Sequence, residues 1–187
     1  KSSDLKKNMF VFEVNSKKKI VLISIKKDLK SFGVENLGAE FYGRINHGKN
    51  SEYFLNSDSV IGKHENFIGH FLHGLKLKSY EFSKYKTKKK TRLISVNVVG
   101  NKNKPSAQTQ LNFKALEEGT FYARDLVSEP GNVLHPDEYA KRINSLKKDG
   151  LKVNIYDEKK LKKMGMNALL GVGMGSTRGS YLVTMEW

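Results

Sequence analysis

Histidines are the residues of this sequence best suited to hold a metal ion or transfer a proton, and two of the five share a helical spacing. His70 and His73 are three residues apart, so a helix would place both on one face, where they could bind one metal ion. Their helix has no nearby carboxylate beyond Glu65, and no His-Glu-x-x-His pattern occurs. We therefore expect two partly exposed helix histidines and no metal site here.

A basic run beside aromatic residues is the strongest indication of nucleic-acid binding. The run is Lys86–Lys90, and the aromatic residues next to it are Tyr80, Phe82 and Tyr85. Cations beside aromatic rings are suited to contacts with phosphates and bases. A solvated loop between a helix and a strand would have the same composition, and we favour that interpretation while keeping the other open. The candidate anion or nucleic-acid contacts are Lys86, Lys88, Lys89, Lys90 and Arg92.

The glycine-rich segment Gly171–Gly179 has some likeness to a phosphate-binding loop. Its spacing is not G-x-G-x-x-G, it contains no Gly-Lys-Ser/Thr, and we expect a strand after it. A tight turn, in which glycine permits positive φ and close backbone approach, is the expected role. Ser128, Ser176 and Ser180 lack the G-x-S-x-G setting of serine hydrolases. These residues predict neither a nucleotide site nor a serine nucleophile.

The net charge of +15 over 187 residues is concentrated in the first part of the chain. Residues 1–104 contain 22 Lys and Arg against 9 Asp and Glu, whereas residues 105–187 contain 12 against 10. Such a field attracts nucleic acid, phosphates and acidic lipid, although scattered lysines are also typical of solvated surfaces. Cysteine is absent, which excludes disulfides and thiol nucleophiles. Without an apolar run of about 18 residues or a signal peptide, we expect a cytoplasmic protein with no membrane contact.

Residue patterns in the first part predict alternating strands and helices. Phe10–Val14 and Ile20–Ile25 are expected to form a strand pair, the second strand being apolar enough for burial on both faces. Further expected elements are a helix through Leu37, Phe41 and Ile45, a strand at Tyr53–Leu55, a helix over 64–75 and a strand at Leu93–Val99.

The polar segment Gly100–Ser106 is the expected domain boundary, because it contains a proline and coincides with the change in charge. A helix with Leu111, Ala115, Tyr122 and Leu126 on one face should follow and end at Pro130. The remaining expected elements are a helix from Pro136 with Tyr139, Ile143 and Leu146 buried, a strand at Leu151–Ile155, a helix from Asp157 to Met164, and strands at Ala168–Val172 and Tyr181–Trp187. This order predicts an α/β fold.

Several segments of residues 62–187 resemble the cytosol (leucyl) aminopeptidases, peptidase family M17, in both order and spacing. Residues 1–61 match only in general pattern. The segments that carry the resemblance are YEFSKYKTKKK at Tyr80–Lys90, ARDLVSEPGNVLHP at Ala123–Pro136, DEKKLKKMGM at Asp157–Met166, LLGVGMGS at Leu169–Ser176 and LVTMEW at Leu182–Trp187.

The resemblance implies an α/β protein in three parts. Residues 1–104 would form a macro-like N-terminal domain with a mixed sheet, incomplete at its start; 105–128 would be a connecting helix, and 129–187 the first, truncated part of a catalytic domain. It also implies a peptidase that removes N-terminal residues, often leucine, from peptides. Such enzymes use two divalent metal ions, manganese or zinc, and assemble as homohexamers.

The family's metal-ligand segments, of the types GKGxxFDSGG and NTDAEGRL, do not occur in this sequence. We therefore assign no catalytic or metal-binding residue, and we expect this chain alone to bind no metal and to be inactive. An alternative function is nucleic-acid binding, with DNA as partner, by the basic N-terminal domain. A further alternative is ADP-ribose binding through the macro-like fold.

Overall fold

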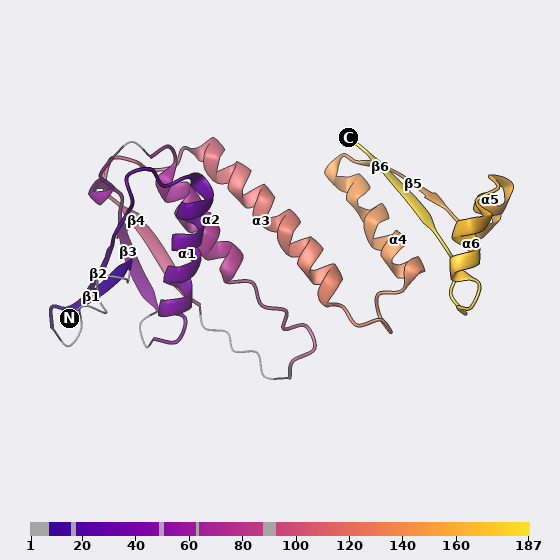
Figure 1. Cartoon of the computed structure of the whole chain (residues 1–187), viewed down its shortest axis with the longest axis horizontal. Coiled ribbons are helices and arrows are strands. Elements are labelled where there is room, and N and C mark those ends of the chain that lie inside the picture. Colours follow the sequence, from indigo (N-terminus) through magenta and orange to yellow (C-terminus); the bar gives the residue numbers. More distant parts are fainter. Residues whose placement is uncertain (1–7, 16–17, 49–50, 63, 88–92) are drawn as a thin grey trace. The chain divides into compact units, whose positions relative to one another are not determined.

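The computed structural model describes residues 8–15, 18–48, 51–62, 64–87 and 93–187 (Figure 1). The chain divides into two compact units, Lys1–Arg124 and Asp125–Trp187. Each unit combines helices with strands, so the predicted α/β class is confirmed. The division falls inside the helix whose ends were expected as domain boundaries, at 104 and 128; those boundaries and the macro-like character of the first domain remain predictions.

Two pairs of strands form the sheet structure of the first unit. β1 (Met9–Glu13) pairs antiparallel with β2 (Lys19–Ile23). β3 (Glu52–Asn56) pairs in parallel with β4 (Ser95–Val99), with Glu52 opposite Ser95. All four strands lie at the predicted places.

The expectation that the second strand is buried on both faces is wrong. Ile20 is 45% exposed and Leu22 is 55% exposed. Along the described residues β2 pairs with β1 and with no other strand, and the side chains of Val21 and Ile23 pack against the core from one face. Since successive strand residues point to opposite faces, the other face is left in solvent.

Helices α1 (Ser31–Ile45) and α2 (Phe67–Lys78) cross closely in the first unit (Figure 1). Two glycines make this possible, since a Cβ added to Gly38 or to Gly74 would lie 1.9 Å from a backbone oxygen of the other helix. The predicted apolar stripes of α1 and α2 are confirmed. The buried apolar residues around this crossing are Met9, Val34, Leu37, Phe41, Ile45, Phe67, Ile68 and Phe71.

Helix α3 (Ala107–Ser128) confirms the predicted long helix but not its predicted face. Leu111 is 60% exposed. Within the first unit α3 contacts α2 through Phe113, whose ring would meet a Cβ on Gly69 at 2.7 Å. Near its end, Arg124 Nη1 donates to the Leu77 carbonyl at 2.6 Å. Contact residues spaced along a helix by multiples of about 3.6 share a face, and here that face includes polar side chains, which hydrophobicity alone does not reveal.

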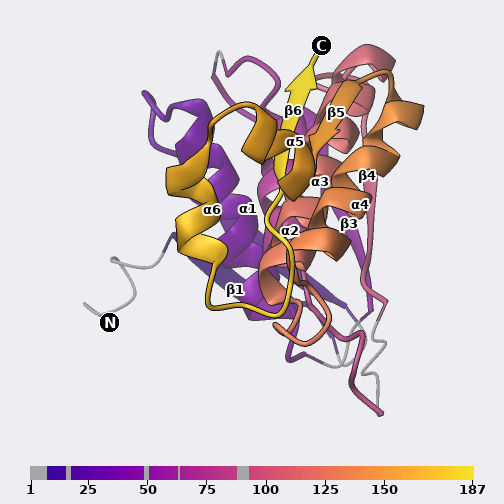
Figure 2. The ribbon, with the colours of Figure 1, turned by 90° about the vertical axis from the view of Figure 1, so that its right-hand side faces the viewer.

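The second unit contains one strand pair and short helices (Figure 2). In the strand pair Lys152 lies opposite Glu186 in an antiparallel register. Leu161 is fully buried, and Ala140, Ile143 and Val153 are nearly so. The elements are α4 (Pro136–Asn144), η3 (Ser145–Asp149), β5 (Lys152–Tyr156), α5 (Glu158–Lys163), α6 (Asn167–Gly173) and β6 (Leu182–Glu186).

Two predictions for this unit are wrong. Residues 168–172 lie in helix α6, with Leu170 N–H donating to the Met166 carbonyl at 3.2 Å, and do not form a strand. A short apolar run fits either state, so periodicity could not decide between them. Tyr139 is 47% exposed, and Ala140 takes the buried position next to Ile143. Among the described residues, no helix is both long enough and apolar enough to cross a membrane.

Candidate functional site

The predicted anion-contact residues fall largely outside the described part of the chain. Lys88, Lys89, Lys90 and Arg92 belong to residues 88–92, which are not described. Lys86 is described, and its Nζ lies 2.6 Å from Glu81 Oε1, with both side chains about half exposed. An adjacent carboxylate partly neutralises the charge of a lysine, so the lysine attracts a phosphate less strongly. The geometry therefore leaves the nucleic-acid interpretation an untested prediction.

The two helix histidines are held by carboxylates from two different helices. His70 Nδ1 lies 2.8 Å from Glu35 Oε1 on α1, and His73 Nδ1 lies 3.0 Å from Glu117 Oε1 on α3. An ionised carboxylate only accepts, so each imidazole donates from Nδ1. His73 also stacks on Phe113 with ring centroids 4.8 Å apart.

The predicted partial exposure is confirmed for His70 and is wrong for His73, which is buried. The His73 side chain is only 9% exposed and that of His70 21%. Their acidic partners lie 35 and 44 positions away in sequence, so no local motif could have indicated them. The arrangement ties α2 to both neighbouring helices and supports a structural role.

A buried ion pair fixes the start of the second unit. Arg142 Nη1 donates to Glu129 Oε1 at 2.9 Å, and its Nε donates to Glu138 Oε1 at 3.0 Å. The Glu129 side chain is only 2% exposed. Hydrogen bonds to both carboxylates raise the pKa of Arg142 above its ordinary value, first through Glu138. The hydrogen bond from Arg142 likewise lowers the pKa of Glu138. Arg142 lies 13 positions from Glu129 in sequence, so no local motif indicates this pair.

His135 forms a second polar contact at the N-terminus of α4. The side chain of His135 does not cap the helix; its Nδ1 instead bonds to Asp137 Oδ1. Arg178 Nη1 lies 3.6 Å from the other oxygen of Asp137. Desolvation opposes ionisation of Asp137, but hydrogen bonds from His135 and its own backbone outweigh it and lower the pKa. These contacts join α4 to the loop before β6.

The glycine-rich segment does not form a phosphate cradle. Gly171 and Gly173 lie inside helix α6, and none of the glycines between 171 and 179 has a positive φ. The predicted positive-φ turn is therefore wrong, whereas close approach is confirmed at Gly173, where an added Cβ would meet Ser180 Oγ at 2.1 Å. The backbone N–H of Ser180 donates to Glu158 Oε1 at 3.1 Å. The segment packs locally onto its own neighbours.

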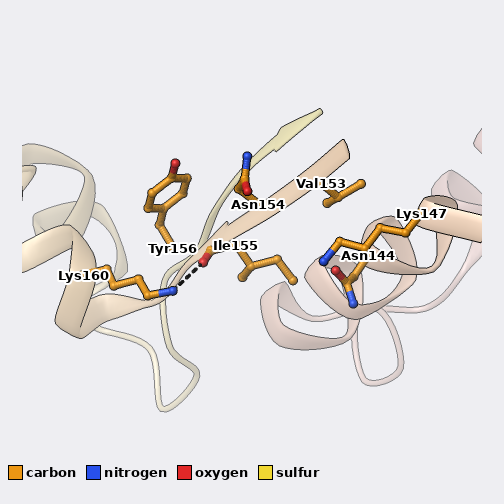
Figure 3. A pocket seen from close by; sticks show the side chains of 7 residues that line it. All are labelled: Asn144, Lys147, Val153, Asn154, Ile155, Tyr156 and Lys160. Carbon is orange, nitrogen blue, oxygen red and sulfur yellow. Dashed lines mark hydrogen bonds between the residues drawn. The ribbon is translucent and has the colours of Figure 1, made fainter. Parts of the chain in front are cut away.

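A surface hollow in the second unit has a volume of about 380 Å³ (Figure 3). Lys160 Nζ, which faces it, is engaged with the Ile155 carbonyl at 3.2 Å. No carboxylate or histidine is among its lining residues, so it lacks an acid–base pair near neutral pH. Its lining residues are Asn144, Lys147, Val153, Asn154, Ile155, Tyr156 and Lys160.

Metal-ligand geometry is absent from the described residues, in which no group of three or more His, Cys, Asp or Glu side chains could hold an ion. The polar clusters of both units consist of ion pairs that stabilise contacts between elements.

Comparison with known proteins identifies the second unit. Residues 121–187 match the model of the cytosol aminopeptidase family, catalytic domain. A probable cytosol aminopeptidase of Agrobacterium fabrum is 43% identical over 123 residues, covering 63% of this chain and 25% of the relative. Another, from Nitrobacter winogradskyi, is 32% identical over 178 residues, covering 90% of this chain and 35% of the relative.

Solved structures agree on the fold. A tomato leucine aminopeptidase mutant superimposes with a TM-score of 0.81 at 21% identity, covering 98% of this chain and 39% of that chain. The bottromycin maturation enzyme BotP gives 0.74 at 21% identity, covering 95% and 39%. The chain thus spans about a quarter to two fifths of the length of these proteins. The predicted resemblance is confirmed, because residues 121–187 match the catalytic domain of the cytosol aminopeptidase family.

Proposed function

We propose that this chain is part of a metal-dependent aminopeptidase that removes N-terminal residues, of the leucine type, from peptides. The observation that carries the proposal is the match of residues 121–187 to the family's catalytic domain. The compact unit Asp125–Trp187 coincides with that match almost residue for residue. The names of the relatives support a cytosolic location.

Two divalent metal ions, manganese or zinc, are the cofactors that we propose for the whole enzyme. A BotP structure in complex with manganese, similar in fold, supports a metal-dependent reaction. The described residues do not fit such a centre, because they contain no cluster of three or more potential ligands. We therefore assign no ligand here and propose that this chain by itself is inactive.

The described residues would serve the enzyme by building its framework. Glu129 and Arg142 connect the turn after α3 to α4, and β5 pairs with β6 beside them. A buried pair with good geometry favours one arrangement over others, which suits a scaffold for distant active-site groups. We also propose a macro-like first domain, a connecting helix and assembly into a homohexamer, as the resemblance implies.

The first test is hydrolysis of leucine amide by the protein purified from its source, with and without a chelator. We expect metal-dependent release of leucine and an intact mass that accommodates a further domain. Absence of hydrolysis with manganese and zinc both supplied would overturn the enzymatic proposal.

The second test uses the purified 187-residue chain under the same conditions. We expect no hydrolysis above the metal-only blank, together with a cooperative thermal transition that shows the chain is folded. Turnover by this chain would contradict the proposed inactivity. Light scattering on both preparations measures the assembly, and a monomer in the source preparation would exclude the hexamer.

A further inference from the structure

The parallel pair β3–β4 ends in two segments that are hydrogen-bonded to each other. Ser57–Ser59 follows β3, and residues 100–104 follow β4. Asn103 Nδ2 donates to the Ser57 carbonyl at 3.1 Å, and Ser57 Oγ, fully buried, donates to the Val99 carbonyl at 3.0 Å. The carboxyl end of parallel strands is the edge at which open α/β sheets bind ligands.

Two successive backbone N–H groups point at one position on this edge. The N–H of Asn101 and the N–H of Lys102 both donate to Asp58 Oδ1, at 2.8 and 2.6 Å. Consecutive amides directed at one point form a concavity that binds anions. The position holds a carboxylate oxygen supplied by the protein itself.

The backbone around this position is shaped to admit an anion. Gly100 has φ of 110°, and a Cβ added there would lie 2.9 Å from Asp58 Oδ1, so a side chain would obstruct the position. Asn103 has φ of 56°, which turns the loop back toward Ser57. Both conformations are ones that few L-residues adopt, and they hold the two amides in place.

The electrostatic surroundings also favour negative charge. The backbone hydrogen bond from Lys102, then that from Asn101, lowers the pKa of Asp58, and the charges of Lys102 and Lys104 act in the same direction. Asp58 is exposed, so its carboxylate can leave the amides without opening the core. The hydrogen bond from the buried Ser57 to Val99 does not involve Asp58, so it would keep the ends of β3 and β4 together when Asp58 leaves.

We propose that the Asn101–Lys102 amide pair is a binding site for a small oxyanion, a phosphate or a carboxylate, which Asp58 keeps closed by occupying it. This site lies in the first unit and does not depend on the proposed peptidase activity. Asp58 acts as an internal substitute for the ligand, so an external anion binds only when that carboxylate is displaced or removed.

The test compares the wild-type chain with Asp58→Ala, using inorganic phosphate and acetate as probes. In Asp58→Ala we expect saturable shifts of the Asn101 and Lys102 amide resonances, and a rise in Tm of about 2–4 °C at near-saturating phosphate. The wild type should bind at least about tenfold more weakly, because its own carboxylate competes. Asp28→Ala, which removes an exposed aspartate elsewhere in the unit, should behave like the wild type.

The two probes separate a phosphate ligand from a carboxylate ligand, since the tighter one identifies the class. A folded Asp58→Ala chain whose two amides do not shift with either anion would overturn the proposal. Should Asp58→Ala fail to fold, Asp58→Ser keeps a polar side chain but lacks the carboxylate oxygen that reaches the two amides. Unchanged Asn101 and Lys102 resonances in folded Asp58→Ser would overturn the proposal equally.

Discussion

The two units of this chain are stabilised in different ways. The first is built around the α1–α2 crossing, where apolar side chains such as Phe71 and Ile68 are almost completely buried. In residues 125–187, all of which are described, four apolar residues are buried: Ala140, Ile143, Val153 and Leu161. In the second unit the Glu129–Arg142–Glu138 ion network accompanies this smaller core.

Both units leave large apolar side chains exposed. Val172, Met174 and Trp187 in the second unit are each more than 80% exposed. Large exposed apolar side chains within one small unit mark surfaces suited to further contacts. In the first unit Ile61 and Leu93 are exposed to a similar degree, at 87% and 85%. The units therefore differ in their cores, and core changes should be felt more strongly in the first unit, where more large side chains are buried.

The largest expected effect is that of Phe71→Ala in the first unit. Phe71 is 1% exposed and packs on Phe41 with ring centroids 5.6 Å apart. We expect a loss of about 3–5 kcal/mol in the free energy of unfolding, against about 2–3 kcal/mol for Leu161→Ala in the second unit. Denaturant unfolding of both variants measures the two values. An equal or larger loss at Leu161 would contradict the contrast between the units.

The helix crossing provides the second test. Gly74→Ala puts a methyl group 1.9 Å from the Glu35 carbonyl oxygen, so α1 and α2 must move apart. We expect a loss of about 2–4 kcal/mol, measured by thermal unfolding. Gly43→Ala is the matched control on α1, since nothing lies within 4 Å of its added Cβ. That control should be neutral or stabilising by about 0.5–1 kcal/mol.

The next largest expected loss of stability concerns the ion network of the second unit. Arg142→Met removes the guanidinium from the buried carboxylate of Glu129, and we expect a loss of about 2 kcal/mol. The double variant Glu129→Met, Arg142→Met should recover part of that loss, because no charge is then left buried. A double variant less stable than either single variant, in urea unfolding, would show that the network contributes more than removal of buried charge explains.

The pH dependence of Tm tests the same network with a smaller expected effect. Glu138 has a lowered pKa in the folded chain, so its contribution is present above the ordinary value of 4.5 and is lost as the pH falls through the folded value. We expect Glu138→Gln to lower Tm at pH 7 and to reduce the further drop below pH 4.5. Glu118→Gln, at an exposed carboxylate on α3, is the control. If Tm falls below pH 4.5 as much in Glu138→Gln as in the wild type, Glu138 does not contribute to the loss of stability in acid.

The smallest expected effect concerns the basic run of the first unit. Lys86→Ala removes an exposed pair with Glu81, so stability should change by less than about 0.5 kcal/mol. If the run binds DNA, titration of the wild-type chain at two salt concentrations should show affinity falling with salt, and Lys86→Ala should reduce the slope by about one contact at most. An affinity that does not change with salt would exclude phosphate contacts.

Sequence patterns predicted the existence and type of most elements, because periodicity reports which face of a segment is apolar. The stripes of α1 and α2 were predicted on that basis. The helix predicted from Asp157 is confirmed as α5, where the Asp157 side chain accepts from Lys160 N–H at 3.0 Å. Residues 168–172 were assigned to the wrong state because a short apolar run does not distinguish strand from helix. The contact face of α3 was missed because it contains Glu117 and Arg124.

By itself the sequence determined the α/β class, the resemblance to the family and the absence of the family's metal-ligand segments from these 187 residues, since each depends on local pattern or on order along the chain. Tertiary structure alone decided which charges meet. The partners of His73, Arg142 and Asp58 lie 44, 13 and about 43 positions away. Such pairs depend on how helices and strands cross, and the energy of a charge depends on distance and burial, which no linear spacing specifies.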